Sequence, residues 1–240
     1  MKLSIIIPCY NEEKGIPNLV SQLDPVVKEL KKKYVCELIF VDDGSIDGTN
    51  ALLHKHYKNS KNVVILKHKK NKNLGAALKT GFAHASGDFI AALDSDCTYS
   101  PKLFITMLNM MDDKTDIVTV SPYHPKGRVT NVQFYRVFLS RSASMIYKFL
   151  LNSKIHTFSA MVRVYKKQVI KDVKFKSNSF LGVTEIMIRA ILRGYRVIEL
   201  PAEVKVRKYG VSKMKTASVI LEHIGLMTKI ILYKIMGITF

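Results

Sequence analysis

The first 121 residues alternate between short apolar runs and longer amphipathic stretches. The apolar runs cover Leu3–Pro8, Glu37–Val41, Val63–Leu66, Phe89–Leu93 and Ile117–Val120. Helical patterns lie between them at 12–33, Asp47–Tyr57, 75–85 and Pro101–Met111. Strand and helix alternating at this spacing predict βαβ units. We therefore expect a Rossmann-like α/β fold, with a mostly parallel sheet flanked by helices on both faces.

Two carboxylates, Asp94 and Asp96, stand where the fourth apolar run ends. Unpaired charges are costly to bury, so they are poor packing material. In open α/β sheets ligands bind outside the carboxyl ends of the strands. The other unusual segments, Pro8–Glu12 and Asp42–Ser45, follow the first and second runs. An Asp-x-Asp alone is common in solvated loops, but in this place it suits a divalent cation that meets substrate phosphates.

Several alternative classes find little support in the sequence. No G-x-G-x-x-G follows the first run and no P-loop occurs, which disfavours hydride transfer and P-loop phosphoryl transfer. Cys9, Cys36 and Cys97 are widely spaced, so we expect reduced thiols in a cytosolic protein without a zinc site. The chain starts directly with a strand-like run, which predicts no signal peptide.

Positive charge is concentrated in the second part of the chain. Residues 1–100 hold 14 lysines and 11 acidic residues, a formal charge of +3, whereas residues 101–240 reach +16. This asymmetry predicts an anionic partner for the second part: nucleic acid, a membrane surface or a phosphorylated substrate. For the scattered lysines, ordinary solvated faces are the alternative.

The motifs of the chain resemble those of family-2 glycosyltransferases with the GT-A fold. The resemblance rests on Ile5–Glu13, Val41–Thr49, Asn73–Gly75 through Ala85–Asp88, and Asp94-Ser95-Asp96. Within that family, the second half is most similar to dolichyl- and polyprenyl-phosphate mannosyltransferases. This closer similarity rests on Ser140–Ala143, Met161–Tyr165, Gly194–Arg196, Glu199–Pro201 and Arg207–Lys213. Together these motifs cover residues 1–215.

The resemblance implies a metal-dependent transfer of a sugar from a nucleotide-diphosphate sugar, with inversion at the anomeric carbon. It implies donor-binding roles for Pro8, Tyr10, Asn11, Glu12, Asp43, Gly75 and Asp94. It places Mg²⁺ or Mn²⁺ on Asp94 and Asp96, and it gives catalytic roles to these two residues with Arg141, Arg163 and Glu185. The acceptor phosphate is assigned to Arg128, Arg141, Arg163, Arg207, Ser212 and Lys213. For Asp42, Asp43 and Asp47 the alternative is capping of the next helix.

The arginines favour a phosphate acceptor over a hydroxyl acceptor. A hydroxyl must lose a proton as it attacks and needs a base, whereas a lipid phosphate is already ionised and needs positioning. Arginine forks suit phosphate oxygens. Glu185 lies where hydroxyl-using relatives carry their base, but a pair with Arg189 one helical turn on is equally expected. The chain has no tryptophan, which excludes the Gln-x-x-Arg-Trp motif of processive synthases.

Three departures from the family pattern bear on the acceptor. Pro122 replaces the arginine of a common Ser-Arg-Tyr motif, so either one phosphate-binding arginine is lost or Arg128 supplies that charge. Thr98 stands where a metal-assisting Gln is frequent, and Met161 where Gly is common. These changes leave the fold intact but are expected to reshape the acceptor pocket.

The amphipathic patterns of two segments predict contact with a membrane. No stretch reaches about 18 uncharged apolar residues, so no transmembrane helix is expected. In the tail, Lys215–Phe240, a helix would have a narrow polar stripe of Lys215, Glu222 and Lys229, and most of its remaining surface would be apolar. Phe134–Leu151 is the second amphipathic segment. We predict a catalytic domain at 1–215 and a tail at 216–240 that docks on a membrane or on a membrane-spanning partner protein. Ordinary packing of both segments on the sheet is the alternative.

The leading hypothesis is an enzyme that moves mannose or glucose to a polyprenyl phosphate, peripherally on the cytosolic face of a membrane. A family-2 enzyme with a hydroxyl acceptor is the nearest rival, and an inactive scaffold is disfavoured by the intact Asp94 and Asp96. Nucleic-acid binding needs aromatic platforms interleaved with charge. Here the basic residues lie within the glycosyltransferase motifs, so no nucleic-acid partner is expected.

Overall fold

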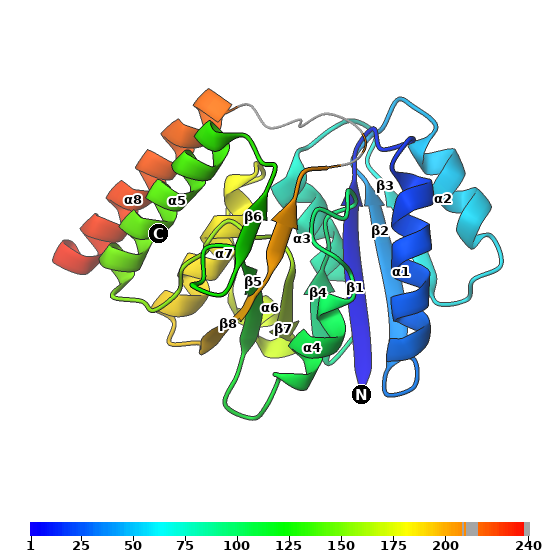
Figure 1. The fold of residues 1–240 in the computed structure, drawn as a ribbon, viewed down its shortest axis with the longest axis horizontal. Coiled ribbons are helices and arrows are strands. Elements are labelled where there is room, and N and C mark those ends of the chain that lie inside the picture. Colours follow the sequence, from blue (N-terminus) through cyan, green and yellow to red (C-terminus); the bar gives the residue numbers. More distant parts are fainter. Residues whose placement is uncertain (208, 210–215, 238–240) are drawn as a thin grey trace.

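The computed structural model describes residues 1–207, 209 and 216–237, and in this part of the chain a seven-stranded sheet forms the centre (Figure 1). Its strand order is β3-β2-β1-β4-β7-β5-β8. The strands are β1 (Lys2–Cys9), β2 (Val35–Asp42), β3 (Val63–Lys67), β4 (Phe89–Ala92), β5 (Ile117–Ser121), β7 (Arg163–Lys166) and β8 (Val197–Pro201). A separate parallel pair joins β6 (Arg128–Thr130) to β9 (Glu203–Lys205).

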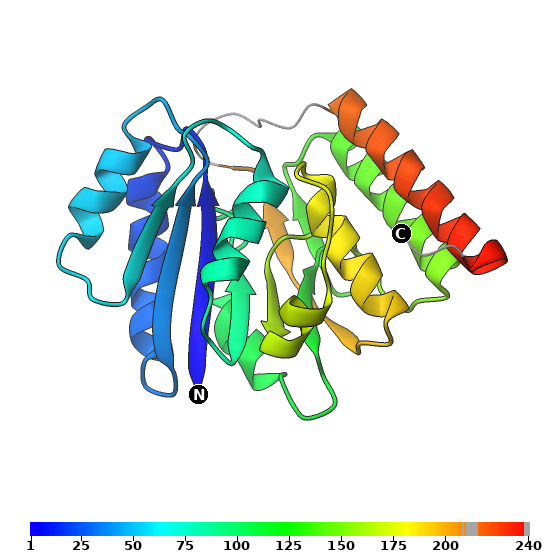
Figure 2. The ribbon, with the colours of Figure 1, turned by 180° about the vertical axis from the view of Figure 1, so that it is seen from behind.

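Helices cover both faces of the sheet, as the alternating pattern predicts (Figures 1 and 2). One face carries α1 (Ile16–Leu30), α2 (Thr49–Tyr57) and α4 (Leu103–Asn109), and the other carries α3 (Leu74–His84), α6 (Lys167–Asp172) and α7 (Leu181–Leu192). In β1, Ile5 packs toward the first set and Ile6 toward the second, which is the period-2 alternation of a strand buried on both sides.

Helix α3 approaches β1 closely because Gly81 has no side chain. A Cβ at this position would lie 2.4 Å from Cγ2 of Ile6. This close contact fixes α3 against the strand that leads into the site.

The predicted elements of residues 1–121 are confirmed, with small shifts of their ends. Helix α1 begins at Ile16 and not at residue 12, because the carbonyl of Glu12 accepts from the N–H groups of Gly15 and Ile16 in a tight turn. Pro25 lies inside α1, which continues to Leu30.

The one antiparallel strand of the large sheet is β7, and the alternating pattern does not predict it. Arg163 lies opposite Ala92 of β4 and Thr119 of β5, and both pairings are antiparallel. A four-residue strand carries no local signal of its direction; the two neighbouring strands decide it.

Helices α5 (Phe134–Leu151) and α8 (Thr216–Met236) lie side by side at one end of the sheet (Figures 1 and 2). A third apolar cluster joins them to α7 through Tyr147, Ile188, Leu226 and Ile230. The tail prediction therefore needs a correction in detail. One apolar side of α8 packs on the body of the protein. Glu222, a member of the predicted polar stripe, turns inward and accepts a hydrogen bond from the hydroxyl of Ser179.

The other side of this helix pair is exposed. In the ranges that the structure describes, no helix combines the length and apolarity needed to cross a bilayer. Lys215 lies outside the described residues.

Candidate active site

The site forms where β1, β2 and β4 end and their following loops meet. The N–H of Asp43 donates to the carbonyl of Cys9 at 2.8 Å, which ties the first loop to the second. Asn11 extends this link, because its N–H donates to Oγ of Ser45 at 2.9 Å and its Oδ1 accepts from the N–H of Ile46 at 3.0 Å. Asn11 adopts a φ of 51°, a left-handed conformation that asparagine tolerates. Hydrogen bonds thus hold the predicted donor segment on the second loop.

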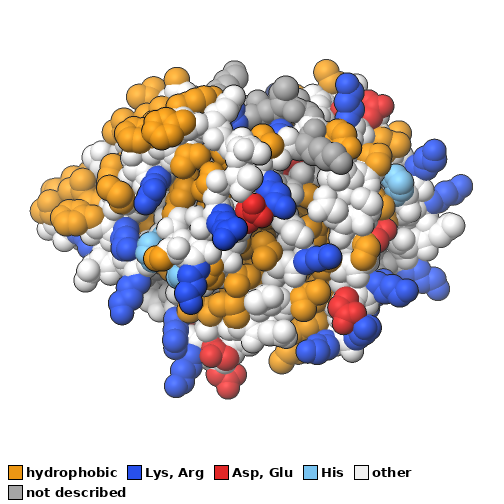
Figure 3. All heavy atoms as spheres, in the orientation of Figure 1, with side chains coloured by type: hydrophobic (Ala, Val, Ile, Leu, Met, Phe, Trp, Pro, Cys, Tyr) orange, Lys and Arg blue, Asp and Glu red, His pale blue; other side chains and the backbone are white. Residues whose placement is uncertain are grey.

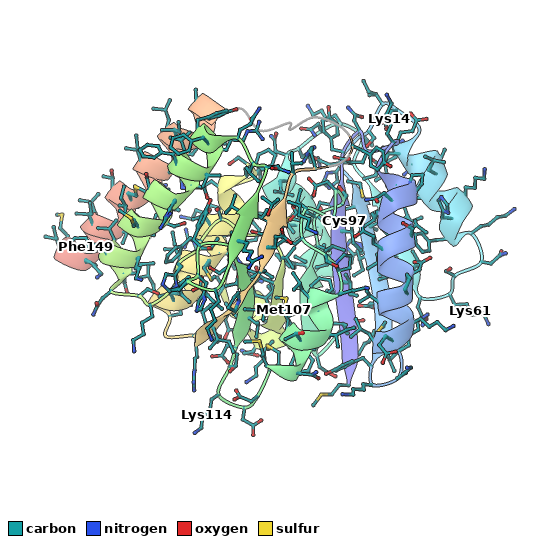
Figure 4. The ribbon with its side chains drawn as sticks, in the orientation of Figure 1. Lys14, Lys61, Cys97, Met107, Lys114 and Phe149 are labelled. Atoms are coloured by element: carbon teal, nitrogen blue, oxygen red, sulfur yellow. The ribbon has the colours of Figure 1, made fainter. Side chains whose placement is uncertain are left out.

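An acidic cluster with one arginine lies next to these loops. Nη2 of Arg207 donates to Oδ2 of Asp96 at 2.6 Å, and Nη1 of Arg207 lies 3.8 Å from Oε1 of Glu12. The other oxygen of Asp96 accepts from the N–H of Thr98 at 3.1 Å. Residues separated by more than 100 positions in the chain therefore meet at the end of β4, where Figure 4 labels the neighbouring Cys97.

The surroundings of Asp94 oppose its ionisation. Burial raises the pKa of Asp94 to about 8, and the nearby charge of Asp96 adds to this effect. Arg207 and, more weakly, Arg163 oppose it, while Glu12 raises the pKa further. Near neutral pH this carboxyl group is therefore largely protonated, unless additional positive charge arrives.

The cluster fits a divalent cation that a substrate helps to bind. Three carboxylates, on Glu12, Asp94 and Asp96, face one guanidinium, so negative charge is in excess. No group of three or more ligating side chains with metal-site geometry occurs among the described residues. Mg²⁺ and Mn²⁺ sites of enzymes that use nucleotides need only one or two carboxylates, since phosphate oxygens and water complete the shell. Asp94 and Asp96 are the residues that would hold the ion.

Asp43 is tightly bound within the protein. Its Oδ1 lies 2.6 Å from Nδ1 of His68 and accepts from the N–H of Lys72 at 2.9 Å, while Oδ2 accepts from the side-chain amide of Asn71 at 2.9 Å. These contacts draw the loop between β3 and α3 over the second loop. Asp42 instead accepts from the N–H of Ser45 at 2.8 Å in a local turn. It does not cap the next helix, because α2 begins at Thr49 after Gly48 and has no side-chain cap.

A cavity of about 480 Å³ opens beside Asp94 and extends to the α5/α8 pair. Its walls come from the loop after β5, from α5, from residues 157–161, from the start of α7 and from α8. Most of the lining is apolar. Among the described lining residues, Asp94 is the one carboxylate and Arg136 is the one lysine or arginine. An ionisable acid and a cation therefore line the same, largely apolar chamber.

The comparisons with known proteins agree with this arrangement. Residues 4–174 match the model of the family described as "Glycosyl transferase family 2". The chain is 30% identical over 222 residues to the polyprenol monophosphomannose synthase of Mycolicibacterium smegmatis, covering 90% of this chain and 82% of that protein. The chain belongs to glycosyltransferase family 2.

Two further proteins extend the comparison. The dolichol-phosphate mannosyltransferase of Pyrococcus furiosus is 29% identical over 251 residues, covering 100% of this chain and 69% of that protein. Glucosyl-3-phosphoglycerate synthase from Mycobacterium tuberculosis, solved with Mn²⁺, UDP-glucose and phosphoglyceric acid, has a TM-score of 0.70 at 16% identity and covers 100% of this chain and 81% of that one. The predicted fold class is confirmed: this glycosyltransferase has the GT-A fold.

Two residues predicted for the site of this family-2 glycosyltransferase have structural contacts instead. Glu185 accepts from the N–H groups of Lys176 and Ser177 at 3.0 and 2.8 Å and from Nε of Arg189 at 2.7 Å. Although burial acts to raise it, these contacts lower the pKa of Glu185, and its side chain does not line the cavity. The expected pair with Arg189 is present, and a role as general base has no support.

Gly75 is covered by the same loop that Glu185 holds. Its N–H donates to the carbonyl of Ser179 at 3.1 Å, and a Cβ on Gly75 would lie 2.4 Å from the carbonyl oxygen of Ser177. The start of α3 thus meets protein carbonyls and not an open space for a donor phosphate. The expected contact of Gly75 with the donor stays a prediction.

The predicted arginines separate into different environments. Arg163 is fully buried and does not line the cavity. Arg128 lies in β6 opposite Glu203, and its neighbour Val129 faces the cavity instead. Arg141 is exposed on α5. Burial raises the pKa of the Tyr123 hydroxyl in the cavity wall, and the nearby charge of Arg141 partly offsets this rise. Ser212 and Lys213 lie outside the described residues.

Arg136 is the cavity residue that the sequence reasoning missed. Its Nε donates to the hydroxyl of Tyr135 at 3.2 Å, and its guanidinium lies over that ring. The sequence did contain a signal for Arg136: it lies one helical turn before Ser140, so the two residues share a face of the helix, and Ser140 also lines the cavity. Pro122 and Met161, two of the departures from the family pattern, line the same cavity. Their expected effect on the acceptor pocket stays a prediction, as does the division of the chain at residue 215.

Proposed function

We propose that this glycosyltransferase moves a hexose, mannose or glucose, from a nucleotide-diphosphate sugar to a polyprenyl phosphate on the cytosolic face of a membrane. The observation that carries the proposal is the cavity, which joins Asp94 at one end to the apolar α5/α8 pair at the other and has Arg136 in its wall. Such a chamber suits a molecule with an anionic head and an isoprenoid chain. The names of the two mannosyl-transferring relatives support the same substrate class.

On the donor side, Pro8 lies near the end of β1, and Tyr10, Asn11, Glu12 and Asp43 lie in the loops after β1 and β2, which hydrogen bonds join. A divalent cation, when bound, would stabilise the charge that develops on the leaving nucleoside diphosphate. Asp94 and Asp96 would hold it, and Asp94 gives up its proton to do so. Asp43 would act by holding the donor loop in place through its contacts with His68, Asn71 and Lys72.

On the acceptor side, an oxygen of the lipid phosphate attacks the anomeric carbon while the bond from that carbon to the diphosphate oxygen breaks. The phosphate is ionised at neutral pH, so this step needs no base from the protein. Arg136 lines the cavity and can attract an anionic head group into it, and Arg207 lies beside Asp96. The occupied carboxylate of Glu185 fits this chemistry better than it fits a hydroxyl acceptor.

The outer surface of α5 and α8 supports attachment to a membrane. Phe134, Phe138 and Phe149 on α5 are 82%, 60% and 85% exposed, and Leu221 and Ile235 on α8 are 70% and 77% exposed. Figure 3 shows hydrophobic side chains gathered over this helix pair at the left, and Figure 4 shows Phe149 at the edge of the molecule. Large apolar patches of this kind mark interaction surfaces, and amphipathic helices lie in bilayer interfaces. The lipid substrate would then enter its cavity from the side that faces the bilayer.

The test is transfer from a panel of labelled nucleotide sugars to polyprenyl phosphate in detergent, with Mn²⁺ or Mg²⁺. Wild type is compared with Asp96→Ala and with Asp113→Ala, a control that removes an exposed carboxylate in a distant turn. We expect metal-dependent labelled lipid in wild type and in the control but not in Asp96→Ala. Donor hydrolysis without lipid product would move the acceptor to a hydroxyl, and no activity with any donor would refute the proposal.

Membrane attachment is tested separately by flotation with liposomes that contain anionic lipids. Phe138→Glu combined with Phe149→Glu should reduce the bound fraction strongly, whereas Val35→Glu, which changes an exposed apolar residue at the start of β2, should not. If wild type does not float, direct attachment of the protein to the bilayer is wrong, and the apolar surface instead requires a membrane-spanning partner protein.

A further inference from the structure

Arg163 is the largest fully buried polar side chain of the described residues, and its charge has no adjacent carboxylate. Nη1 donates to the carbonyl of Val183 at 2.5 Å, Nη2 donates to the carbonyl of Phe158 at 2.6 Å, and Nε donates to Oγ1 of Thr119 at 3.3 Å. Within the part of the chain that the structure describes, no carboxylate oxygen lies within 4.0 Å of its guanidinium. A cation in such a place is costly unless its hydrogen bonds are well made.

The acceptors of these hydrogen bonds lie in three separate segments of the chain. Thr119 is in β5, Phe158 is in the loop between α5 and β7, and Val183 is in the first turn of α7. Phe158 and Val183 both line the cavity beside Asp94. Arg163 itself lies opposite Ala92, two residues before Asp94, in the antiparallel pairing of β7 with β4. One side chain thus connects two walls of the cavity to the strand that leads into the acidic cluster.

The shape of the guanidinium explains why an arginine suits this position. Its donors point in several fixed directions in one plane, whereas a lysine ammonium is a single point on a flexible chain. The two Nη groups reach carbonyls of different segments, and Nε reaches a third segment. An apolar side chain would fill the volume but would take these donors away from the buried carbonyls of Phe158 and Val183.

We propose that Arg163 is a positioning residue that holds the cavity walls at Phe158 and Val183 in place relative to β4, the strand that leads to Asp94. It acts on the acceptor through these walls and touches neither substrate. Its predicted direct contact with the acceptor phosphate is replaced by this indirect role. The proposal rests on the proposed function, because the cavity is taken to hold the lipid acceptor.

The test uses two variants of the network and one control in the full chain. Arg163→Lys keeps the charge but removes the fork, and Thr119→Val keeps the arginine but removes the acceptor of Nε. Arg189→Lys is the control, because Arg189 is also buried but pairs with Glu185 away from the cavity. Three quantities are measured: the KM for polyprenyl phosphate, the rate of metal-dependent donor hydrolysis without acceptor, and amide hydrogen exchange in segments 157–161 and 181–184.

We expect Arg163→Lys to raise the acceptor KM about tenfold, the size of losing one charge-assisted hydrogen bond. Donor hydrolysis should stay within about twofold of wild type, since the carboxylates at the end of β4 are unchanged. Exchange should become faster in both wall segments. Thr119→Val should act in the same direction and more weakly, and Arg189→Lys should change neither the KM nor the exchange of these segments.

Three outcomes would overturn the proposal. Equal losses of hydrolysis and transfer would place Arg163 on the donor side. Faster exchange with an unchanged acceptor KM would make it a structural residue only, and unchanged exchange would show that it does not hold the walls. If wild type forms no lipid product, the proposed function fails, while the exchange of Arg163→Lys against Arg189→Lys still decides whether the arginine fixes the two walls.

Discussion

Replacing Arg207 by methionine should tighten the binding of Mn²⁺ in the absence of substrates. The guanidinium of Arg207 donates to Oδ2 of Asp96 at 2.6 Å and lies 3.8 Å from Oε1 of Glu12. Its positive charge therefore stands where a metal ion would bind in the acidic cluster. An incoming metal ion must break this contact before it can use that oxygen. The same residue is expected to help hold the acceptor phosphate, so the substitution should affect metal binding and sugar transfer in opposite directions.

The size of the effect follows from the contact. A hydrogen bond between charged groups contributes about 1.5–3 kcal/mol, and about 1.4 kcal/mol corresponds to a factor of ten in an equilibrium constant. The side chain of Arg207 is 26% exposed, so solvent weakens the bond and the lower end of the range applies. We expect the dissociation constant of Mn²⁺ to fall by roughly tenfold, while transfer to polyprenyl phosphate falls by at least as much.

The assay is titration with Mn²⁺, in which the free ion is followed by electron paramagnetic resonance. It is carried out at the same series of pH values for every variant, because Arg207 lowers the pKa of Asp94 and its removal makes that carboxyl group harder to ionise. Arg136→Met is the matched control, because Arg136 lines the cavity and no hydrogen bond or ion pair joins it to Asp96 in the described structure. It should lower transfer and leave metal affinity unchanged. Unchanged or weaker binding of Mn²⁺ by Arg207→Met would refute the idea that Arg207 competes with the metal.

Three further predictions concern stability. Because the pKa of Asp94 is raised from 3.8 to about 8, the folded metal-free protein binds this proton more tightly than the unfolded chain, and stability falls as pH rises between these values. Asp94→Asn should therefore raise the Tm at pH about 8 without metal, and a lower Tm would contradict this reasoning. Gly75→Ala should cost about 1–3 kcal/mol in urea unfolding, since its Cβ would meet the carbonyl oxygen of Ser177; an unchanged midpoint would mean that the loop yields freely. Burial alone would raise the pKa of Glu37, but contacts with Lys2 and other donors lower it from 4.5 to about 2. Glu37→Gln should lose about 1–3 kcal/mol at neutral pH and should remove the loss of stability that wild type shows as pH falls from 4.5 toward 2, which unfolding curves at several pH values would test.

Local patterns were sufficient for the first part of the fold. The apolar run of β1 and the helical spacing before His84 are properties of neighbouring residues, and they predict elements whose ends shift by only a few positions. The acidic pair was equally visible, because Asp94 and Asp96 interrupt an apolar strand where burial of charge is costly. Arg207 was assigned to the phosphate, yet its contact with Asp96, 111 positions away in the chain, has no local signal.

The site residues whose predicted role changed depend on contacts with segments outside their own helix or strand. Glu185 carries the right chemistry for a base, but the loop at Ser177 folds back onto it and occupies both oxygens. Arg163 has the right chemistry for a phosphate, but its place in β7, between β4 and β5, buries it in the interior. In both cases the residue type was read correctly, and its surroundings were decided by packing.

The sequence by itself determined the parallel half of the sheet, the place of the carboxylates and the presence of two amphipathic helices. The tertiary structure alone decided the antiparallel insertion of β7, the cavity between Asp94 and the α5/α8 pair, and the choice of Arg136 over Arg128 for its wall. The physical reason is the range of the information. Periodicity reports which side of an element is buried, whereas which two distant side chains meet depends on how whole elements pack.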